Sequence, residues 1–482
     1  MRRTRQFRSV LAVVVYTLCS SCLFAQSAAK TVYLDQGWSP EEREAFYYTA
    51  QGSELIPYQW FLHLEVKGGK TLFRDDRHLD RLRYVTRAAS KVWNPQGLPV
   101  GFVEDKVIDP TQTSSKVSFL KRKFNKKANA DDKKTWLGLT CAACHTNVIE
   151  FGASRIQIDG APAMSDLQSF LEELAAAVES THSDADKMER FVKKLGIPNT
   201  PEAKAEFKAE FVSHSQALNE LVKRNASQTR YGFARLDAFG AILNAVCDAG
   251  LDLDANRVEA NAPVSYPFLW ETPRMDWVQW NSISNVPLGR NVGEVLGVFG
   301  FFTLKNTNDK QHQFDSTVKL KALIGLENSL KKLKAPLWPE ELLGKLDPQK
   351  VQQGRTLFAA NCAGCHQVRK TDGTFETKQM GQEMRMTTVT VPVQVIGTDP
   401  QMISNLGKLV DPGVLKQLLA PPLNMSDKVP RPPLLSLTVS EVTKNRAQIE
   451  QVPIVVDPGV AAMQPPFGGT GYKARALEGI WA

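Results

Sequence analysis

The pentapeptide Cys141-Ala142-Ala143-Cys144-His145 recurs later in the chain as Cys362-Ala363-Gly364-Cys365-His366. Cysteines at this spacing leave the same side of a helical turn, where both can add across the two vinyl groups of a haem. The histidine that follows then brings an imidazole to the iron. The sequence therefore predicts two covalently bound haem c groups. Their attachment residues are Cys141, Cys144, Cys362 and Cys365, and their iron ligands are His145 and His366.

Other chemistries use a lone Cys-x-x-Cys, either as a redox dithiol or as half of a zinc site. Here both copies end in histidine, and neither lies in a βαβ pattern of the thioredoxin kind. Both also follow an export signal, and export leads to the compartment where thioether attachment takes place. These three features favour haem over the dithiol and zinc interpretations.

The first 29 residues have the pattern of a signal peptide. A charged start is followed by an apolar run from Val10 to Leu18 and by small residues up to Ala29. That run is too short to span a bilayer, and no later run reaches the roughly eighteen apolar residues that a span needs. We therefore expect a periplasmic protein with no membrane span, and a lipid anchor at Cys22 is the alternative.

The charge balance argues against a nucleic-acid partner. The formal net charge is +8, but four arginines before position 9 are the only charges ahead of Lys30, so the remainder carries +4. Haem propionates would lower this value further. The one dense basic stretch, residues 116–127, is interpreted as a solvated loop, with docking of an acidic redox partner as the alternative.

The length of 482 residues exceeds what one hydrophobic core usually supports. Apolar residues recur at helical spacing from Met164 to Thr181, with Ser165 placed as a cap. A helix start is also indicated at Ser39-Pro40-Glu41-Glu42. Strand-like alternation is scarce, and its best case is Arg155–Ile158.

From this pattern we predict a mainly α fold. It would consist of two c-type cytochrome domains, each with one covalently bound haem, plus long irregular loops such as Pro421–Pro433. A boundary is expected near Ala335–Pro339, where proline interrupts the helical pattern. The N-terminal haem domain would then cover residues 30–335 and the C-terminal cytochrome c domain residues 336–482.

The stretch from Tyr266 to Phe302 is dense in aromatic residues. It contains the tryptophans Trp270, Trp277 and Trp280 and a cluster of polar residues that includes Arg290 and Glu294. Aromatic-rich helical segments are usually core, which is one interpretation of each residue. The other is that the stretch lines the distal face of a haem, where Glu294 could move a proton and a tryptophan could carry an electron.

The sixth iron ligands are not fixed by the sequence. No histidine follows His366, so the candidates on that side are methionines, each of which could equally be core filler. They are Met380, Met384, Met386, Met402, Met425 and Met463. One further cysteine, Cys247, lies in an apolar helical run and is expected to be a buried, inert thiol.

Several motifs resemble the bacterial di-haem cytochrome c peroxidase superfamily, in the branch of rubber-oxygenase-like periplasmic di-haem c-type cytochromes. The similarity runs over nearly the whole chain after the signal peptide. Its motifs are Leu34–Trp38, Gln51–Ser53, the pentapeptide Cys141–His145, Ile158–Ala163, Ala262–Trp270, Gly289–Glu294 and Gly397–Pro400. The part from Tyr266 to Glu294 is the more specific to this branch.

The resemblance implies a division of labour between the two haems. The N-terminal haem would be open to peroxide or dioxygen, and the C-terminal haem would pass electrons that a small redox protein or another donor supplies. An aromatic residue between the haems is typical, and Trp270, Trp277 and Trp280 are the candidates. The catalytic residues implied are Glu294, Arg290, Trp270 and Trp280.

The C-terminus departs from the branch. There, the segment similar to Gly471–Arg475 and Gly479–Ala482 is normally followed by a histidine that ligates the second haem. Because this chain stops at Ala482, we interpret it as a fragment of a longer protein. A methionine ligand, or no strong sixth ligand, is the alternative.

Three functional hypotheses follow. The first is a di-haem oxidoreductase that activates peroxide or dioxygen at the His145 haem, and it is the one favoured by the aromatic stretch and the resemblance. The second is a non-enzymatic electron-transfer cytochrome with two six-coordinate irons. The third is a sensing module whose open haem binds a small gas.

Overall fold

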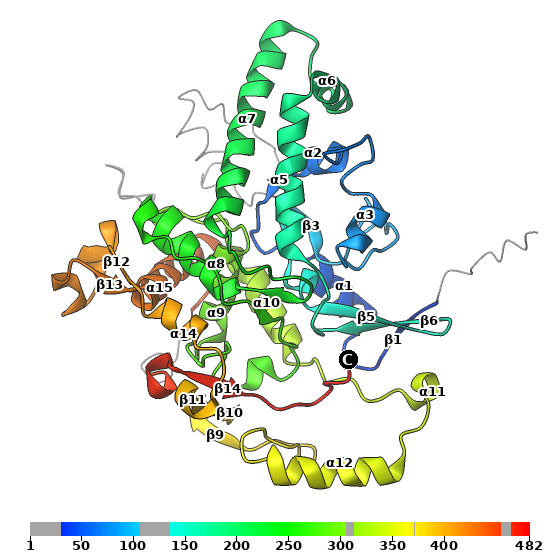
Figure 1. Cartoon of the computed structure of the whole chain (residues 1–482), viewed down its shortest axis with the longest axis vertical. Helices are drawn as coiled ribbons and strands as arrows, with labels where there is room; N and C mark the ends of the chain where they lie inside the picture. The colour runs from blue at the N-terminus through cyan, green and yellow to red at the C-terminus, as the bar shows by residue number, and fades with distance from the viewer. Residues whose placement is uncertain (1–29, 107–134, 305–312, 371, 455–463) are drawn as a thin grey trace, which may run out of the picture.

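The structure is a computed structural model that describes residues 30–106, 135–304, 313–370, 372–454 and 464–482 (Figure 1). The predicted signal peptide and the basic stretch at 116–127 lie outside these ranges. Among the residues described, no helix is long and apolar enough to cross a membrane.

Two three-stranded sheets hold the N-terminal pentapeptide. The strands of the first, in spatial order, are β1 (Lys30–Tyr33), β6 (Ser154–Asp159) and β5 (Thr146–Phe151); those of the second are β2 (Ile56–Pro57), β4 (Trp136–Leu139) and β3 (Phe102–Asp105). Only the β1–β6 pair is parallel. Strand β4 ends two residues before Cys141, and β5 begins directly after His145. The pentapeptide is therefore the connection between the two sheets.

Helices of the N-terminal half begin where local capping signals place them. The helices are α1 (Pro40–Tyr48), α2 (Tyr58–His63), α3 (Asp76–Arg81), α5 (Leu167–Ser183), α6 (Ala185–Lys194) and α7 (Pro201–Arg224). The predicted start at Pro40 is confirmed, because Ser39 and Glu42 form a reciprocal capping box there. The cap of α5 is Asp166 rather than the predicted Ser165, since Asp166 accepts from the main-chain N–H of Ser169.

An aromatic core joins these helices to the second sheet. The Phe170 ring on α5 lies 5.5 Å from the Phe102 ring of β3 and 5.3 Å from the Tyr84 ring, and all three side chains are almost fully buried. Helices α5, α6 and α7 stand together at one end of the molecule (Figure 1). The core therefore lies at the base of this helical group, beside the pentapeptide.

A second core lies among helices that are distant in the sequence. The helices are α9 (Pro287–Gly297), α10 (Leu320–Leu330) and α15 (Arg431–Glu450), and α8 (Ala238–Asn244) packs beside α9. Val292 and Leu323 pack in one buried cluster with Leu434 and Val442 of α15. The prediction of an irregular loop over Pro421–Pro433 is thus partly wrong, because α15 begins at Arg431. The prolines that follow Arg431 lie in the first turn of the helix, where no amide donor is needed.

Apart from α12, the remaining elements are short. The helices are α11 (Glu340–Leu343), α12 (Pro348–Asn361), α13 (Val393–Ile396) and α14 (Gln401–Leu406). Four two-stranded sheets pair β7 (Arg235–Leu236) with β8 (Val264–Ser265), β9 (Thr377–Met380) with β10 (Glu383–Met386), β11 (Val389–Pro392) with β14 (Gly471–Ala474), and β12 (Leu409–Val410) with β13 (Val429–Pro430). Helix α12 lies at the end of the molecule opposite α7 (Figure 1).

The prediction of a mainly α fold built from two c-type cytochrome domains is wrong. The described ranges contain six small sheets, and both pentapeptides are followed by strands. Most of these strands have two to four residues, and β9 (Thr377–Met380) exposes three of its four side chains. Strands of this length span too few residues for an alternating apolar pattern to stand out, which is why the sequence did not reveal them.

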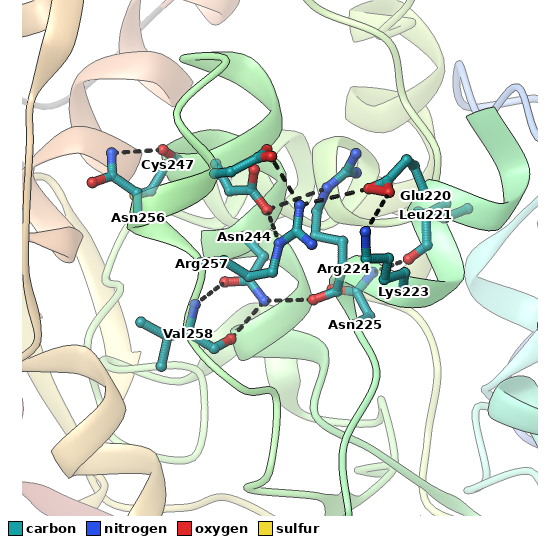
Figure 2. Close-up of polar contacts among 12 residues, drawn as sticks. Glu220, Leu221, Lys223, Arg224, Asn225, Asn244, Cys247, Asn256, Arg257 and Val258 are labelled. Atoms are coloured by element: carbon teal, nitrogen blue, oxygen red, sulfur yellow. Dashed lines mark hydrogen bonds and ion pairs between the residues drawn. The ribbon is translucent and has the colours of Figure 1, made fainter. Parts of the chain in front are cut away.

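A polar network fixes the junction between α7 and the turn that follows α8 (Figure 2). Arg257 donates from Nε to buried Asp248 over 2.7 Å, and Asn244 donates to the main-chain carbonyls of Arg224 and Val258. Cys247 lies within this turn and is fully buried, as predicted, and burial raises the pKa of its thiol to about 11. The cluster is structural, because each of these contacts ties one main-chain segment to another.

Candidate functional site

The N-terminal pentapeptide forms a tight turn, the 3₁₀ helix η1 (Cys141–Ala143). Thr140 caps it, accepting from the N–H of Ala142 and donating to the carbonyl of Tyr47. A Cβ at Gly101 would lie 2.2 Å from the main-chain nitrogen of Ala143, so only glycine, here with φ of +83°, permits this close approach. The turn is thus held from both sides.

The thiols of this turn are protonated at neutral pH. Burial is the main reason that the pKa of Cys141 rises to about 11 and that of Cys144 to about 12, and the negative charge of Glu294 adds to both shifts. A catalytic dithiol would instead need a lowered pKa. Across the described ranges, no three His, Cys, Asp or Glu side chains gather in a way that could hold a metal ion. A haem iron needs no such cluster, because porphyrin nitrogens supply most of its ligands.

The imidazole of His145 is oriented by the main chain. Its Nδ1 lies 2.8 Å from the carbonyl oxygen of Pro267, so that nitrogen carries the proton and donates it. Burial lowers the pKa of His145 to about 4, which keeps the ring neutral. The Nε2 atom is then the basic nitrogen, as an iron ligand requires.

The C-terminal pentapeptide repeats this arrangement. Helix α12 ends at Asn361, and the following turn brings the N–H of His366 within 2.9 Å of the carbonyl of Cys362. The Nδ1 of His366 lies 2.6 Å from the carbonyl oxygen of Arg475. Both pentapeptide histidines therefore use the same nitrogen to donate to a distant carbonyl, which leaves Nε2 for a metal in each case.

Helix α12, which leads into this second pentapeptide, buries none of its side chains. Leu357 is 63% exposed, and Val368 just beyond the pentapeptide is 56% exposed. A porphyrin is a large apolar disc, and apolar side chains beside its attachment cysteines are the surface that suits it. The surroundings of Cys362 and Cys365 therefore fit a haem.

Three buried cations lie between the two pentapeptides: Arg290, Lys473 and Arg475. Burial lowers the pKa of Arg475 to about 9, and burial with the charges of the two arginines lowers the pKa of Lys473 well below its ordinary value. Within the described residues, Nε of Arg475 and Nη1 of Arg290 are buried without a hydrogen-bond partner. Arg290 already has a carboxylate partner, because its Nη2 lies 2.6 Å from Oε2 of Glu327. Arg475 and Lys473 donate to main-chain carbonyls instead. Buried cations of this kind call for anionic partners, and haem carries two propionates.

Glu294 on α9 lies within electrostatic reach of Cys141 and Cys144. Burial raises the pKa of its carboxyl, against the opposing effects of a hydrogen bond from Gln279 and the charge of Arg290. The Nε2 of Gln279 donates to Oε1 of Glu294 over 2.7 Å. A raised pKa brings this carboxyl closer to the range that suits a general acid or base.

Glu294 also lines an apolar pocket between α5, α7, α8 and α9. The pocket is walled by Leu171, Leu221, Ile242 and Phe299, among others, and its empty space is about 680 Å³ when the open solvent at its mouth is counted. A polar group at the edge of a mostly apolar pocket is the usual form of a small-molecule site. The carboxyl of Glu294 is therefore part of the wall of this pocket.

The predicted tryptophans occupy different places. Trp270 is fully buried, stacks on Phe268 with ring centroids 4.6 Å apart, and donates from its indole N–H to the carbonyl of Glu478. Trp280 is partly buried, and its carbonyl accepts from the N–H of Lys473. Of the two, only Trp270 is adjacent to the segment that orients His145.

The sequence predicted that Arg290 and Glu294 line a haem's distal face, and in the structure the charges of both act on Cys141. It assigned no role to Gln279, Lys473 or Arg475. The sequence feature that could have indicated Lys473 and Arg475 is their spacing of two residues at strand β14, which puts both side chains on one face of an extended chain.

Of the methionine candidates within the described ranges, Met384 and Met425 are exposed, while Met380, Met386 and Met402 are buried. Met463 lies outside those ranges.

Comparison with known proteins gives one similarity. The chain is 29% identical over 496 aligned residues to the uncharacterized protein y4iJ of Sinorhizobium fredii (strain NBRC 101917 / NGR234), and the alignment covers 94% of this chain and 78% of that protein. No family model matches the chain. No solved structure matches it.

Proposed function

We propose that this chain is a periplasmic di-haem c-type cytochrome oxidoreductase of the peroxidase or oxygenase type. One observation carries the proposal: both pentapeptide histidines donate from Nδ1 to a main-chain carbonyl and keep Nε2 for an iron. Haem attachment depends on the pentapeptide and this imidazole, so it does not require a mainly α cytochrome fold. The attachment cysteines are Cys141 with Cys144, and Cys362 with Cys365.

The N-terminal pentapeptide is proposed as the reactive site. A bound haem supplies one-electron chemistry and the activation of peroxide or dioxygen at its iron. Glu294 would give and take the proton that such chemistry moves, since burial raises its pKa and Gln279 fixes one of its oxygens. The apolar pocket beside Glu294 would hold the reactant away from bulk water.

The C-terminal pentapeptide is proposed as the electron-transfer site. Cys365 is exposed, whereas Cys141, Cys144 and Cys362 are each partly buried. An exposed attachment site suits contact with an external electron donor, which a small redox protein would provide. Lys473 and Arg475 would neutralise propionates between the two sites, a role that their burial against main-chain carbonyls supports. Arg290, which is paired with Glu327, would add to the positive field there.

Electron paramagnetic resonance of the oxidised protein, followed by peroxide titration, tests this proposal. We expect one high-spin, ligand-accessible iron that reacts with peroxide and one low-spin iron. Two matched variants assign the signals: Cys141→Ser with Cys144→Ser should remove the high-spin signal, and Cys362→Ser with Cys365→Ser the low-spin one. Two low-spin irons that stay low-spin after reduction would instead identify an electron-transfer cytochrome.

A further inference from the structure

The carbonyl groups that orient the two pentapeptide histidines belong to segments that touch each other. His145 Nδ1 donates to Pro267 over 2.8 Å, and His366 Nδ1 donates to Arg475 over 2.6 Å. Pro267 is followed directly by Phe268, whose carbonyl accepts from Nη2 of Arg475 over 2.7 Å. Three hydrogen bonds and the intervening covalent bonds therefore lead from one imidazole to the other.

The ring of Phe268 reinforces this link. The guanidinium carbon of Arg475 lies 3.5 Å from the centre of the Phe268 ring, and the other neighbour of that ring is the stacked indole of Trp270. The planes of the two rings differ by 14°. Guanidinium, phenyl and indole thus form one stack, and a planar guanidinium is suited to such stacking in a way that an ammonium is not.

The contacts of Arg475 differ from those of an ordinary buried arginine. Arg43 is paired with Asp159 at 2.6 Å, and Arg446 with Glu450 at 2.8 Å. Arg475 instead donates to main-chain carbonyls of the segment that anchors His145, while its own carbonyl anchors His366. It lies immediately after β14, whose pairing with β11 fixes the main chain at that point.

We propose that Arg475 is a positioning residue that couples the two haem sites, and that the bonded route through Phe268 and Arg475 carries electrons between them. The inference rests on the proposed function, since it requires a haem at each pentapeptide. In each transfer, the iron at His366 is oxidised by one electron and the iron at His145 is reduced by one. No proton or further reactant takes part in that step.

The test uses the full-length protein with both haems attached. Both midpoint potentials are measured by spectroelectrochemical titration, and the inter-haem transfer rate is measured after rapid reduction. In Arg475→Gln, we expect both potentials to fall, because a nearby positive charge favours the reduced iron, and the transfer to slow. In Arg475→Lys, the charge remains, so the potentials should stay close to the parent values while the transfer slows, since lysine lacks the planar fork.

The matched control is Arg431→Gln, which changes another fully buried arginine, hydrogen-bonded to Asn244 in the second core. It should leave both potentials and the transfer rate unchanged. If Arg475→Gln moves the potential of one iron alone or of neither, or if the control has the same effect as Arg475→Gln, the coupling role is wrong.

Phe268→Leu keeps the carbonyl of residue 268 and removes the stacked ring. It is the second test variant, to be used if Arg475→Gln does not fold. It should slow the transfer with little change in either potential, because the guanidinium loses the ring that holds it against the carbonyl of residue 268. An unchanged rate would overturn the positioning role of this contact. Absorbance of the washed, denatured parent counts its covalently attached haems. Fewer than two attached haems would refute the proposed function itself, whereas two haems without coupling would refute the inference alone.

Discussion

At the scale of single residues, Glu294 is the side chain on which the proposed chemistry depends. Glu294→Gln keeps the size of the side chain and the contact with Gln279 but removes the mobile proton. We expect turnover with peroxide to fall by about 10²–10⁴-fold, the usual effect of losing a general acid or base. The measurement is steady-state activity per attached haem.

The control for this prediction is Glu450→Gln. Glu450 is another buried carboxylate, but it accepts from Arg446 and from the first N–H groups of α10, away from the pentapeptides. Its replacement should affect stability more than turnover. Equal activity of Glu294→Gln and the parent protein would remove Glu294 from the mechanism.

The raised pKa of Glu294 also predicts a pH dependence of stability. Burial makes the folded chain hold this proton above 4.5, the ordinary carboxyl value, where the unfolded chain has released it. The folded state therefore binds more protons in that window, and the contribution of Glu294 to the free energy of unfolding falls as pH rises. Glu294→Gln should gain stability relative to the parent as pH increases above 4.5, measured by urea unfolding. A difference that does not change with pH would contradict this.

At the scale of elements, α12 should depend on haem attachment. It has 14 residues and buries none of its side chains, and an isolated helix of that length is marginal in water. In a Cys362→Ser, Cys365→Ser variant, trypsin should cleave at Lys350 and Arg355 faster than in the haem-loaded parent. Mass spectrometry of the fragments gives the rates, and cleavage at Lys208 in α7 is the internal reference. Identical rates at α12 in both proteins would show that the haem does not cover this helix.

Local signals predicted some elements and could not predict others. The start of α1 at Pro40 and the strand around Arg155–Ile158 were found because caps and apolar alternation are written in adjacent residues. The carbonyls that hold His145 and His366 are 122 and 109 residues away, and every residue has a carbonyl. No residue type therefore marks these acceptors, and only the folded main chain brings them to the imidazoles.

At the scale of the whole molecule, the predicted boundary near Ala335–Pro339 can be tested by packing. Leu434 and Val442 of α15 are fully buried against the cluster that includes Val292 and Leu323. Each such side chain is worth about 1.5–3 kcal/mol when buried. Residues 30–335 expressed alone should therefore unfold at a lower temperature than the full chain, as measured by calorimetry. An unchanged unfolding temperature would establish an independent N-terminal domain.

The candidate site is likewise a property of the whole chain. The pentapeptides, Arg290 and Glu294 could be selected from the sequence because their residue types carry recognisable chemistry. Lys473 and Arg475 could not, since lysine and arginine are ordinarily solvated, and only burial between segments far apart in the sequence makes these two unusual. The small sheets were missed for a related reason, because their partners are distant and their own patterns are short.

The most direct test of the account is the intact mass of the denatured, acid-acetone-washed protein after periplasmic expression. Thioether bonds survive this treatment, whereas a porphyrin held without covalent bonds is extracted. We predict coloured protein whose mass exceeds that of the processed polypeptide by two haems, and by one haem in each double cysteine variant. Colourless protein with the bare polypeptide mass would contradict the central claim.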